Sequence, residues 1–141
     1  MAWTEHAMRR LGEAGYRSGG SRRQVVDLLA GESCAVTALE IDRRLEGVGR
    51  ASVYRTLEQL EHLHLVQRVE IGGDAAGYER VDPELHHHHI VCEGCGRLAP
   101  FASEALEDAI EAVSRRSEFA VAAHDVVLRG TCPRCEHATG R

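Results

Sequence analysis

Two cysteine pairs with metal-ligand spacing are the clearest chemical signal in the sequence. Cys92 and Cys95 are separated by two residues, and Cys132 and Cys135 repeat that spacing near the end of the chain. Each two-residue loop presents both thiolates to one ion, and two such pairs complete the closed tetrahedral site that is typical of structural Zn²⁺. A redox dithiol and mutually unrelated cysteines are the alternatives. A zinc ion here would join the chain end to an earlier strand and couple metal binding to folding.

Four consecutive histidines, His86 to His89, lead directly into the first cysteine pair. Successive side chains on a strand point to opposite faces, so His86 and His88 share one face, and His87 and His89 share the other. Each pair can therefore hold a separate metal ion. An affinity tag is the alternative interpretation, but tags lie at chain termini.

His124 and Glu107 are candidate partners for one of these histidine faces. We expect His124 on a strand over residues 119–128, where a histidine alone is usually an ordinary core residue. Glu107 lies at the edge of the buried stripe of a helix expected over 103–116, and its carboxylate can turn inward from there. We therefore predict a second metal site, formed by His86, His88, Glu107 and His124.

Helical patterns fill the first half of the chain. We expect helices over 3–14 and 22–30, and a third from Thr37 to about Gly47, opened by the capping box of Thr37 and Glu40. In this third helix Leu39 and Leu45 are expected to face inward, with Ile41 at the edge of the stripe.

A fourth helix is expected to begin at Ser52, with apolar residues at helical spacing and with Tyr54 and Arg55 on its outer face. Its inward residues are Val53, Leu57, Leu60 and Leu63. Strands over 65–71 and 77–81 follow, joined by a turn over 72–74. Helices followed by a hairpin predict a winged helix-turn-helix.

The pattern changes near residue 82. Strands are expected over 86–91, 97–101 and 119–128, with the helix over 103–116 between the last two. We predict a mixed α/β (α+β) fold with a winged-helix DNA-binding domain over 1–81, a hinge over 82–84 and a small α/β metal-binding dimerisation domain over 85–141.

Composition restricts the possible classes of protein. The 141 residues carry five cysteines and a net charge of −5, yet residues 1–23 hold five Arg against two Glu. This local basic patch suits either nucleic acid or a solvated helix face. We find neither a charged leader before an apolar run nor a stretch of about 20 apolar residues, so we expect a cytoplasmic protein without a membrane partner. Cysteines in that compartment favour metal binding over disulfides.

The run from Gly49 to Leu57, the histidine tract before the first cysteine pair and the final cysteine pair together resemble the ferric uptake regulator family. The resemblance covers nearly the whole chain. It implies a homodimeric repressor whose fourth helix enters the major groove of double-stranded DNA, at an AT-rich inverted repeat. The resemblance also implies roles for individual residues, with Tyr54 as a base contact, Arg55 and Arg22 as phosphate contacts and Arg17 in the minor groove. The full set of candidate DNA-binding residues is Arg17, Arg22, Arg50, Ser52, Tyr54 and Arg55.

The family's sensor site takes two alternating histidines, a ligand from the second wing strand and one from the DNA-binding domain. By match these are His62, Glu79, His87 and His89. His62 lies where zinc-sensing members carry an aspartate, whereas the ligand position of many iron sensors falls near Cys34, which we otherwise interpret as a small buried apolar residue. The sequence departs from the family pattern in three places. Pro100 replaces a carboxylate that some members supply, and the connection from the wing to the histidine tract is one residue longer than in iron sensors. Near the second helix, Gly19-Gly20-Ser21 replaces the usual Thr and Pro.

These observations predict a metal-dependent repressor of metal homeostasis genes, with structural Zn²⁺ and a regulatory Zn²⁺ or Fe²⁺. Zinc is favoured because of the His62 match and because imidazole-rich tetrahedral sites suit that ion. An iron-responsive or peroxide-sensing repressor is the first alternative. A zinc-dependent hydrolase lacks a His-Glu-x-x-His pattern, and a metal-storage protein leaves the capped helices and outward Tyr54 and Arg55 without a role, so we predict no enzyme.

Overall fold

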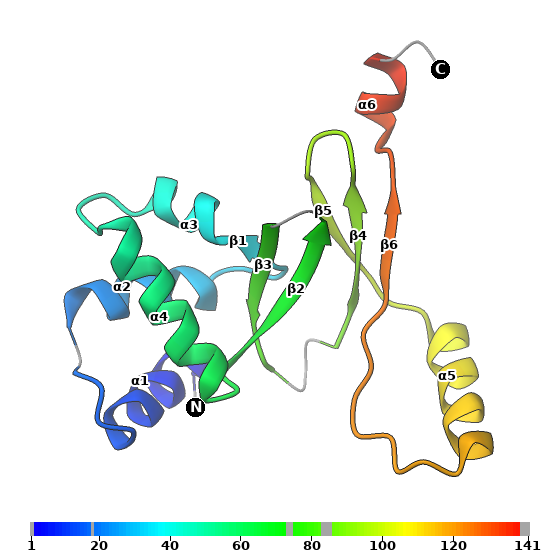
Figure 1. Cartoon of the computed structure of the whole chain (residues 1–141), viewed down its shortest axis with the longest axis horizontal. Helices are drawn as coiled ribbons and strands as arrows, with labels where there is room; N and C mark the ends of the chain where they lie inside the picture. The colour runs from blue at the N-terminus through cyan, green and yellow to red at the C-terminus, as the bar shows by residue number, and fades with distance from the viewer. Residues whose placement is uncertain (1, 18, 73–74, 83–85, 139–141) are drawn as a thin grey trace. The chain divides into compact units, whose positions relative to one another are not determined.

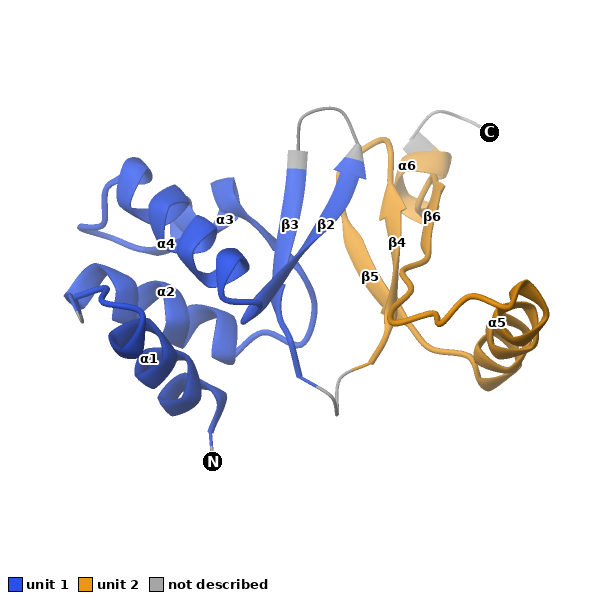
Figure 2. Cartoon of the chain, turned by 60° about the horizontal axis from the view of Figure 1, so that its bottom comes forward, with its two compact units in different colours: residues 1–85 blue, residues 86–141 orange. Residues whose placement is uncertain are grey.

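The computed structural model describes residues 2–17, 19–72, 75–82 and 86–138, and the chain divides into two compact units, 1–85 and 86–141 (Figure 2). The expected hinge over 82–84 and the turn over 72–74 fall largely outside the described residues. No helix of the described ranges has the length and apolarity needed to cross a membrane.

The first unit consists of helices followed by a small sheet (Figure 1). Its elements are α1 (Trp3–Glu13), α2 (Gly20–Ala30), β1 (Val36–Thr37), α3 (Ala38–Arg44), α4 (Arg50–His62), β2 (Val66–Gly72) and β3 (Ala75–Arg80). The sheet has the order β1-β3-β2, and β2 and β3 form the antiparallel hairpin that the alternating pattern predicts. Helices α1, α2 and α4 bury one apolar face each in a common core that includes Leu11, Leu29 and Leu57.

The third helix is rotated relative to our expectation. Leu39 is 43% exposed and Ile41 is fully buried, so the prediction that Leu39 faces inward with Ile41 at the edge was wrong. The inward stripe is Ala38, Ile41 and Leu45, at spacings of three and four residues. Thr37 caps the helix as predicted, because its side chain accepts a hydrogen bond from the Glu40 amide.

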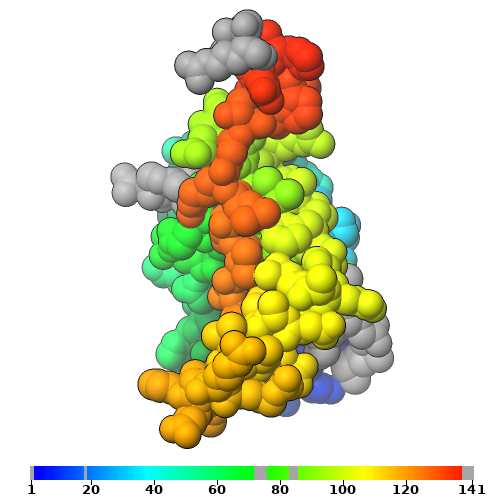
Figure 3. Space-filling model, turned by 90° about the vertical axis from the view of Figure 1, so that its right-hand side faces the viewer, coloured from blue at the N-terminus to red at the C-terminus, as the bar shows by residue number. Residues whose placement is uncertain are grey.

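The second unit is a three-stranded sheet with one long helix and one short helix. Its elements are β4 (His88–Cys92), β5 (Leu98–Phe101), α5 (Glu104–Ser117), β6 (Val127–Gly130) and α6 (Pro133–Ala138). In the order β5-β4-β6, β4 is antiparallel to β5 and parallel to β6. Figure 3 views the side of this unit on which α5 (yellow) and the segment after it (orange) lie at the surface, and α5 has no buried residue.

Three features of this unit differ from the expectation. The strand predicted over 86–91 begins at His88, so His86 and His87 precede β4. The strand predicted over 119–128 is paired only over Val127–Gly130, and the chain from residue 120 to 126 is outside any strand. The short helix α6, which begins inside the second cysteine pair, was not predicted. A helix of six residues is too short to show a periodic apolar face in the sequence.

Candidate metal centres and the outer face of α4

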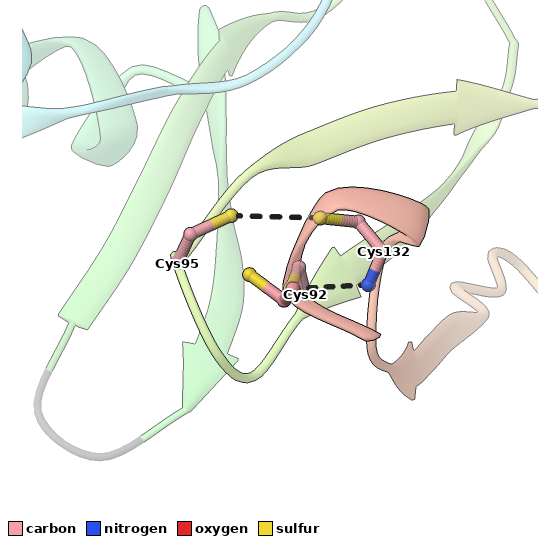
Figure 4. A group of neighbouring side chains, drawn as sticks. Cys92, Cys95 and Cys132 are labelled. Carbon is pink, nitrogen blue, oxygen red and sulfur yellow. Dashed lines mark hydrogen bonds between the residues drawn. The ribbon is translucent and has the colours of Figure 1, made fainter. Parts of the chain in front are cut away.

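The four predicted thiols converge at one end of the second sheet. Their Sγ atoms all lie within 4.8 Å of one another, and the sulfurs of Cys95 and Cys132 are 3.9 Å apart (Figure 4). Regular tetrahedral Zn²⁺ with Zn–S bonds of about 2.3 Å places its sulfurs about 3.8 Å apart. The four cysteine sulfurs therefore fit a tetrahedral Zn²⁺ with little movement.

Local backbone geometry builds this thiol site. Cys92 ends β4, and its sulfur accepts a hydrogen bond of 3.3 Å from the Cys132 amide (Figure 4). Gly94 allows the two knuckles to approach, because a Cβ atom at this position would lie 3.0 Å from the Cys135 sulfur. Gly96 has a φ of +78°, a conformation that glycine adopts without strain, and it closes the first knuckle.

The pKa values of the thiols show how the four sulfurs influence one another. Hydrogen bonds from the backbone of Cys132, and then from that of Cys95, lower the pKa of Cys92 to about 6. Interaction with the side chain of Cys132 first, and then with those of Cys92 and Cys95, raises the pKa of Cys135 to about 12. The raised pKa keeps Cys135 protonated beside the other three sulfurs, because a further negative charge among them is unfavourable. A divalent cation bound by the four sulfurs would favour the thiolate form of all of them.

The second predicted cluster is also assembled within the second unit. One carboxylate, that of Glu107 on α5, binds three imidazoles: Nε2 of His88 at 3.1 Å, Nε2 of His124 at 2.8 Å, and Nε2 of His86. All four ligand groups have atoms within 4.8 Å of one another. His88, the first residue of β4, is only 2% exposed.

Glu107 remains ionised over almost the whole pH range. Hydrogen bonds from His88 first, and then from His124 and His86, lower its pKa from 4.5 to about 2. A carboxylate among imidazoles is a donor set that suits Zn²⁺ and other divalent transition metals. His124 reaches the cluster from the segment before β6 and not from a strand.

Three of the four predicted sensor residues lie near another potential ligand of their own unit. In the first unit Glu79 on β3 is 6% exposed, and ligand atoms of Cys34 and Glu79 lie within 4.8 Å of one another. The Gln67 side-chain amide donates a hydrogen bond to the Glu79 carboxylate. In the second unit the rings of His87 and His89 have centroids 4.9 Å apart.

The remaining sensor candidate lies elsewhere. His62 ends α4, is exposed, and belongs to no group of three or more potential metal ligands among the described residues. Cys34 is half-buried and next to a carboxylate, so it differs from the small core residue that we expected. The sequence signal that pointed to Cys34 was its place in the family pattern, whereas its local sequence contains no metal-binding spacing.

The outer face of α4 presents the predicted polar residues. Tyr54 is 45% exposed, Arg55 is exposed, and Ser52 is half-buried. Arg50 lies in the first turn, where its Nε atom is 3.1 Å from a carboxylate oxygen of Asp42. Helix α4 has neither a side-chain cap at Gly49 nor an acidic residue in its first turn, so its N-terminal dipole is not neutralised by a carboxylate of that turn.

Two further basic residues lie beside this helix. The side chain of Arg17 is exposed, between α1 and α2. Arg22, in the first turn of α2, donates a hydrogen bond of 2.7 Å from Nε to the Gln59 side chain on α4. One of its terminal nitrogens also donates to the Arg17 carbonyl.

Comparison with known proteins gives a consistent result. A ferric uptake regulation protein of Legionella pneumophila is 38% identical over 91 residues, which are 64% of this chain. The matches span 66%, 60% and 61% of the length of this and two further curated relatives. The ferric uptake regulator of Vibrio cholerae superposes with a TM-score of 0.79 at 26% identity, covering 88% of this chain and 98% of that one.

A second solved structure, the Helicobacter pylori ferric uptake regulator, which is described as having three functional metal-binding sites, also gives a TM-score of 0.79, at 25% identity. It covers 94% of this chain and 93% of its own. The family model for the ferric uptake regulators matches residues 13–129, which are most of the chain. This protein therefore belongs to the ferric uptake regulator family.

Proposed function

We propose that this protein is a homodimeric, metal-dependent repressor that binds double-stranded DNA, and that zinc is the metal it senses. The observation that carries the proposal is the outer face of α4, where exposed Tyr54 and Arg55 follow a first turn that contains Arg50 and no acidic residue. A helix inserted in the major groove needs such a face, because base edges and phosphates are reached by exposed polar side chains.

The DNA contacts divide by chemistry. Tyr54 would contact a base edge, and Arg55 and Arg50 would contact phosphates on either side of it, with Ser52 between them. Arg17 would reach the minor groove, in which a guanidinium is attracted by negative potential. An AT-rich inverted repeat suits this arrangement, because AT-rich minor grooves are narrow and a twofold-symmetric dimer matches a palindromic site.

Dimer formation is supported by the apolar surface of the second unit. Val113 on α5 is 64% exposed, Phe119 is 80% exposed, and Leu128 on β6 is 49% exposed. Large apolar side chains grouped on one small unit favour burial against a partner, and a second copy of the chain is the partner we propose.

Metal sensing would combine the two local pairs. We infer that His87 and His89 of the second unit and Glu79 of the first bind one ion, which would then stabilise one arrangement of the units over others. We assigned His62 as the fourth ligand from the family pattern. The proximity of Cys34 to Glu79 instead favours Cys34 as the fourth ligand.

With Cys34 in place of His62, the choice of zinc no longer rests on the His62 match and follows from the donor atoms. A thiolate, two imidazoles and a carboxylate form a set with one soft ligand, which favours Zn²⁺ over the harder Fe²⁺ and Mn²⁺. The thiol site of Cys92, Cys95, Cys132 and Cys135 would hold a separate, structural Zn²⁺, and an iron-responsive repressor is the alternative that a metal titration tests.

The test uses the period-two arrangement of the tract. His87→Ala/His89→Ala is expected to abolish zinc-dependent binding to an AT-rich inverted repeat in a metal-titrated band-shift assay. His86→Ala/His88→Ala is the matched control, with the same number of histidines removed from the other face, and is expected to shift the half-maximal zinc concentration only. Equal losses in both double variants would contradict the sensor assignment.

The fourth ligand has its own comparison. Cys34→Ser is expected to weaken the zinc response, and His62→Ala is expected to leave it unchanged. The reverse result would restore His62 as the ligand. If Fe²⁺ and not Zn²⁺ activates DNA binding by the parent protein under anaerobic conditions, the iron-responsive alternative replaces zinc sensing.

A further inference from the structure

Arg22 occupies a junction between two parts of the first unit. Its Nε atom donates to Oε1 of Gln59 at 2.7 Å, and its Nη1 atom donates to the carbonyl of Arg17. Its guanidinium also lies over the ring of Tyr16, 5.8 Å from the ring centroid. These contacts join α2, the segment before it and α4 through one planar group.

Gln59 places this junction on the face of α4 that carries Arg55. Residues four apart in a helix are neighbours on the same side, so Gln59 follows Arg55 by one turn. Both the Arg22 and the Gln59 side chains are half-buried, which shields their hydrogen bond from water. The guanidinium is therefore anchored to the proposed DNA-binding helix by a hydrogen bond that is partly shielded from water.

The other end of the junction restrains the backbone of Arg17. The Arg17 carbonyl accepts a hydrogen bond of 2.9 Å from the Gly19 amide in addition to the one from Arg22. Gly15, with a φ of +90°, precedes this segment and turns the chain out of α1. Tyr16 packs against the core, so the Arg17 backbone is held between a packed ring and two donors, while its side chain is exposed.

We propose that Arg22 is a positioning residue, which holds the Tyr16–Arg17 segment against α4 and so fixes the distance between Arg17 and Arg55. This inference rests on the proposed DNA-binding function and revises the phosphate-contact role that the family pattern suggested for Arg22. We call the hydrogen bonds from Arg22 to the Gln59 side chain and to the Arg17 carbonyl the tether. A segment that is ordered before DNA binds does not lose conformational entropy on binding, so the tether raises the affinity for DNA without contacting DNA.

The planar guanidinium of Arg22, with its several N–H donors, is essential to this role. A lysine at position 22 keeps the positive charge but has a single ammonium, which cannot bind the Gln59 side chain and the Arg17 carbonyl in the same geometry. A phosphate contact tolerates that replacement far better, because ammonium groups bind phosphate as point charges. Arg22→Lys therefore separates the two roles.

The first test measures DNA affinity in a salt series, with the zinc-loaded protein and a duplex containing an AT-rich inverted repeat. Arg22→Lys and Arg22→Met are both expected to weaken binding about tenfold, the loss typical of one charge-assisted hydrogen bond. Arg23→Lys is the matched control, because Arg23 is exposed and its Nε lies 3.6 Å from Asp27 on its own helix. This variant should bind as the parent does.

A double variant tests the coupling to Arg17. In an Arg17→Ala background, Arg22→Met is expected to cause much less than its tenfold loss, because there is no longer a guanidinium to position. Two results would overturn the proposal. In the first, Arg22→Lys binds DNA like the parent while Arg22→Met lowers the salt slope by about one unit. In the second, the losses of affinity caused by Arg17→Ala and Arg22→Met simply multiply in the double variant.

A measurement without DNA reports the tether itself. In nitrogen-15 spectra of the free protein, the Arg22 Nε–H proton is expected to exchange with water more slowly than that of exposed Arg55, and to lose this protection in Gln59→Leu. Equal exchange at Arg22 and Arg55 in the parent would refute the tether. A parent that binds neither the operator duplex nor an unrelated one would refute the proposed function, and the functional role of Arg22 with it, even where the Nε–H signal shows the tether intact.

Discussion

Gly94 offers a test of the thiol site that leaves all four cysteines in place. A Cβ atom at this position would lie 3.0 Å from the sulfur and 3.2 Å from the Cβ of Cys135. Ordinary contacts of this kind begin at 3.4 Å, so Gly94→Ala requires Cys135 to retreat by a few tenths of an ångström. Metal–ligand distances tolerate only about 0.2 Å, and the displaced thiolate therefore leaves its tetrahedral position.

The expected size of the effect follows from this overlap. Overpacking by one methyl group costs typically about 1–3 kcal/mol, which corresponds to a weakening of zinc binding by about tenfold to a hundredfold. The assay is competition for zinc with a chromophoric chelator, together with the zinc content that remains after mild chelation. Thermal unfolding should show a lower midpoint in the zinc-loaded variant, because less binding energy stabilises the folded state.

Gly130 provides the matched control. It lies in β6 opposite Cys92, and a Cβ atom at this position would have nothing within 4 Å. Gly130→Ala is therefore expected to hold zinc as the parent does. Equal zinc affinity in Gly94→Ala and Gly130→Ala would refute the close approach of the two knuckles.

Three further predictions concern other residues. Cys132→Ser should lose the tightly held zinc and the folded second unit, seen by metal analysis and circular dichroism, because metal binding and folding are coupled; a fully folded variant without zinc would contradict this. Arg55→Ala should weaken operator and non-operator duplexes alike and lower the salt slope by about one unit, whereas Tyr54→Ala should reduce the preference between them; unchanged binding in both would remove α4 from the interface. In metal-free protein the pKa of Glu107 lies at about 2, below its usual 4.5, so its contribution to stability is present above pH 4.5 and lost as the pH falls toward 2. Glu107→Gln should flatten that acid-induced loss in pH-dependent denaturant unfolding, and an unchanged profile would show that the three histidine contacts do not stabilise the fold.

The features that depend only on residues close together in the sequence could be predicted from the sequence alone. The two-residue spacing within each cysteine pair requires only a tight turn, and the opposite facing of His88 and His89 requires only a strand. Apolar spacing in α4 predicted the burial of Val53, Leu57 and Leu60 and left Tyr54 and Arg55 outside, as observed. Leu63, which was also expected to face inward, is half-buried, and the burial of Thr56 was not predicted. The order of these features along the chain was sufficient to indicate the family that the comparisons show.

Tertiary structure decided what depends on contacts between distant segments. Ile41 is buried and Leu39 is exposed because the packing of α3 against its neighbours sets the rotation of this short helix. Its few apolar residues are compatible with more than one inward face. Cys34 meets Glu79 only because β1 and the preceding turn lie beside β3. Arg22 meets Gln59 across 37 residues because α2 packs on α4. Sequence periodicity specifies which face of an element is apolar, but the partner that covers the face, and the polar groups that meet at its rim, are determined by how the elements pack.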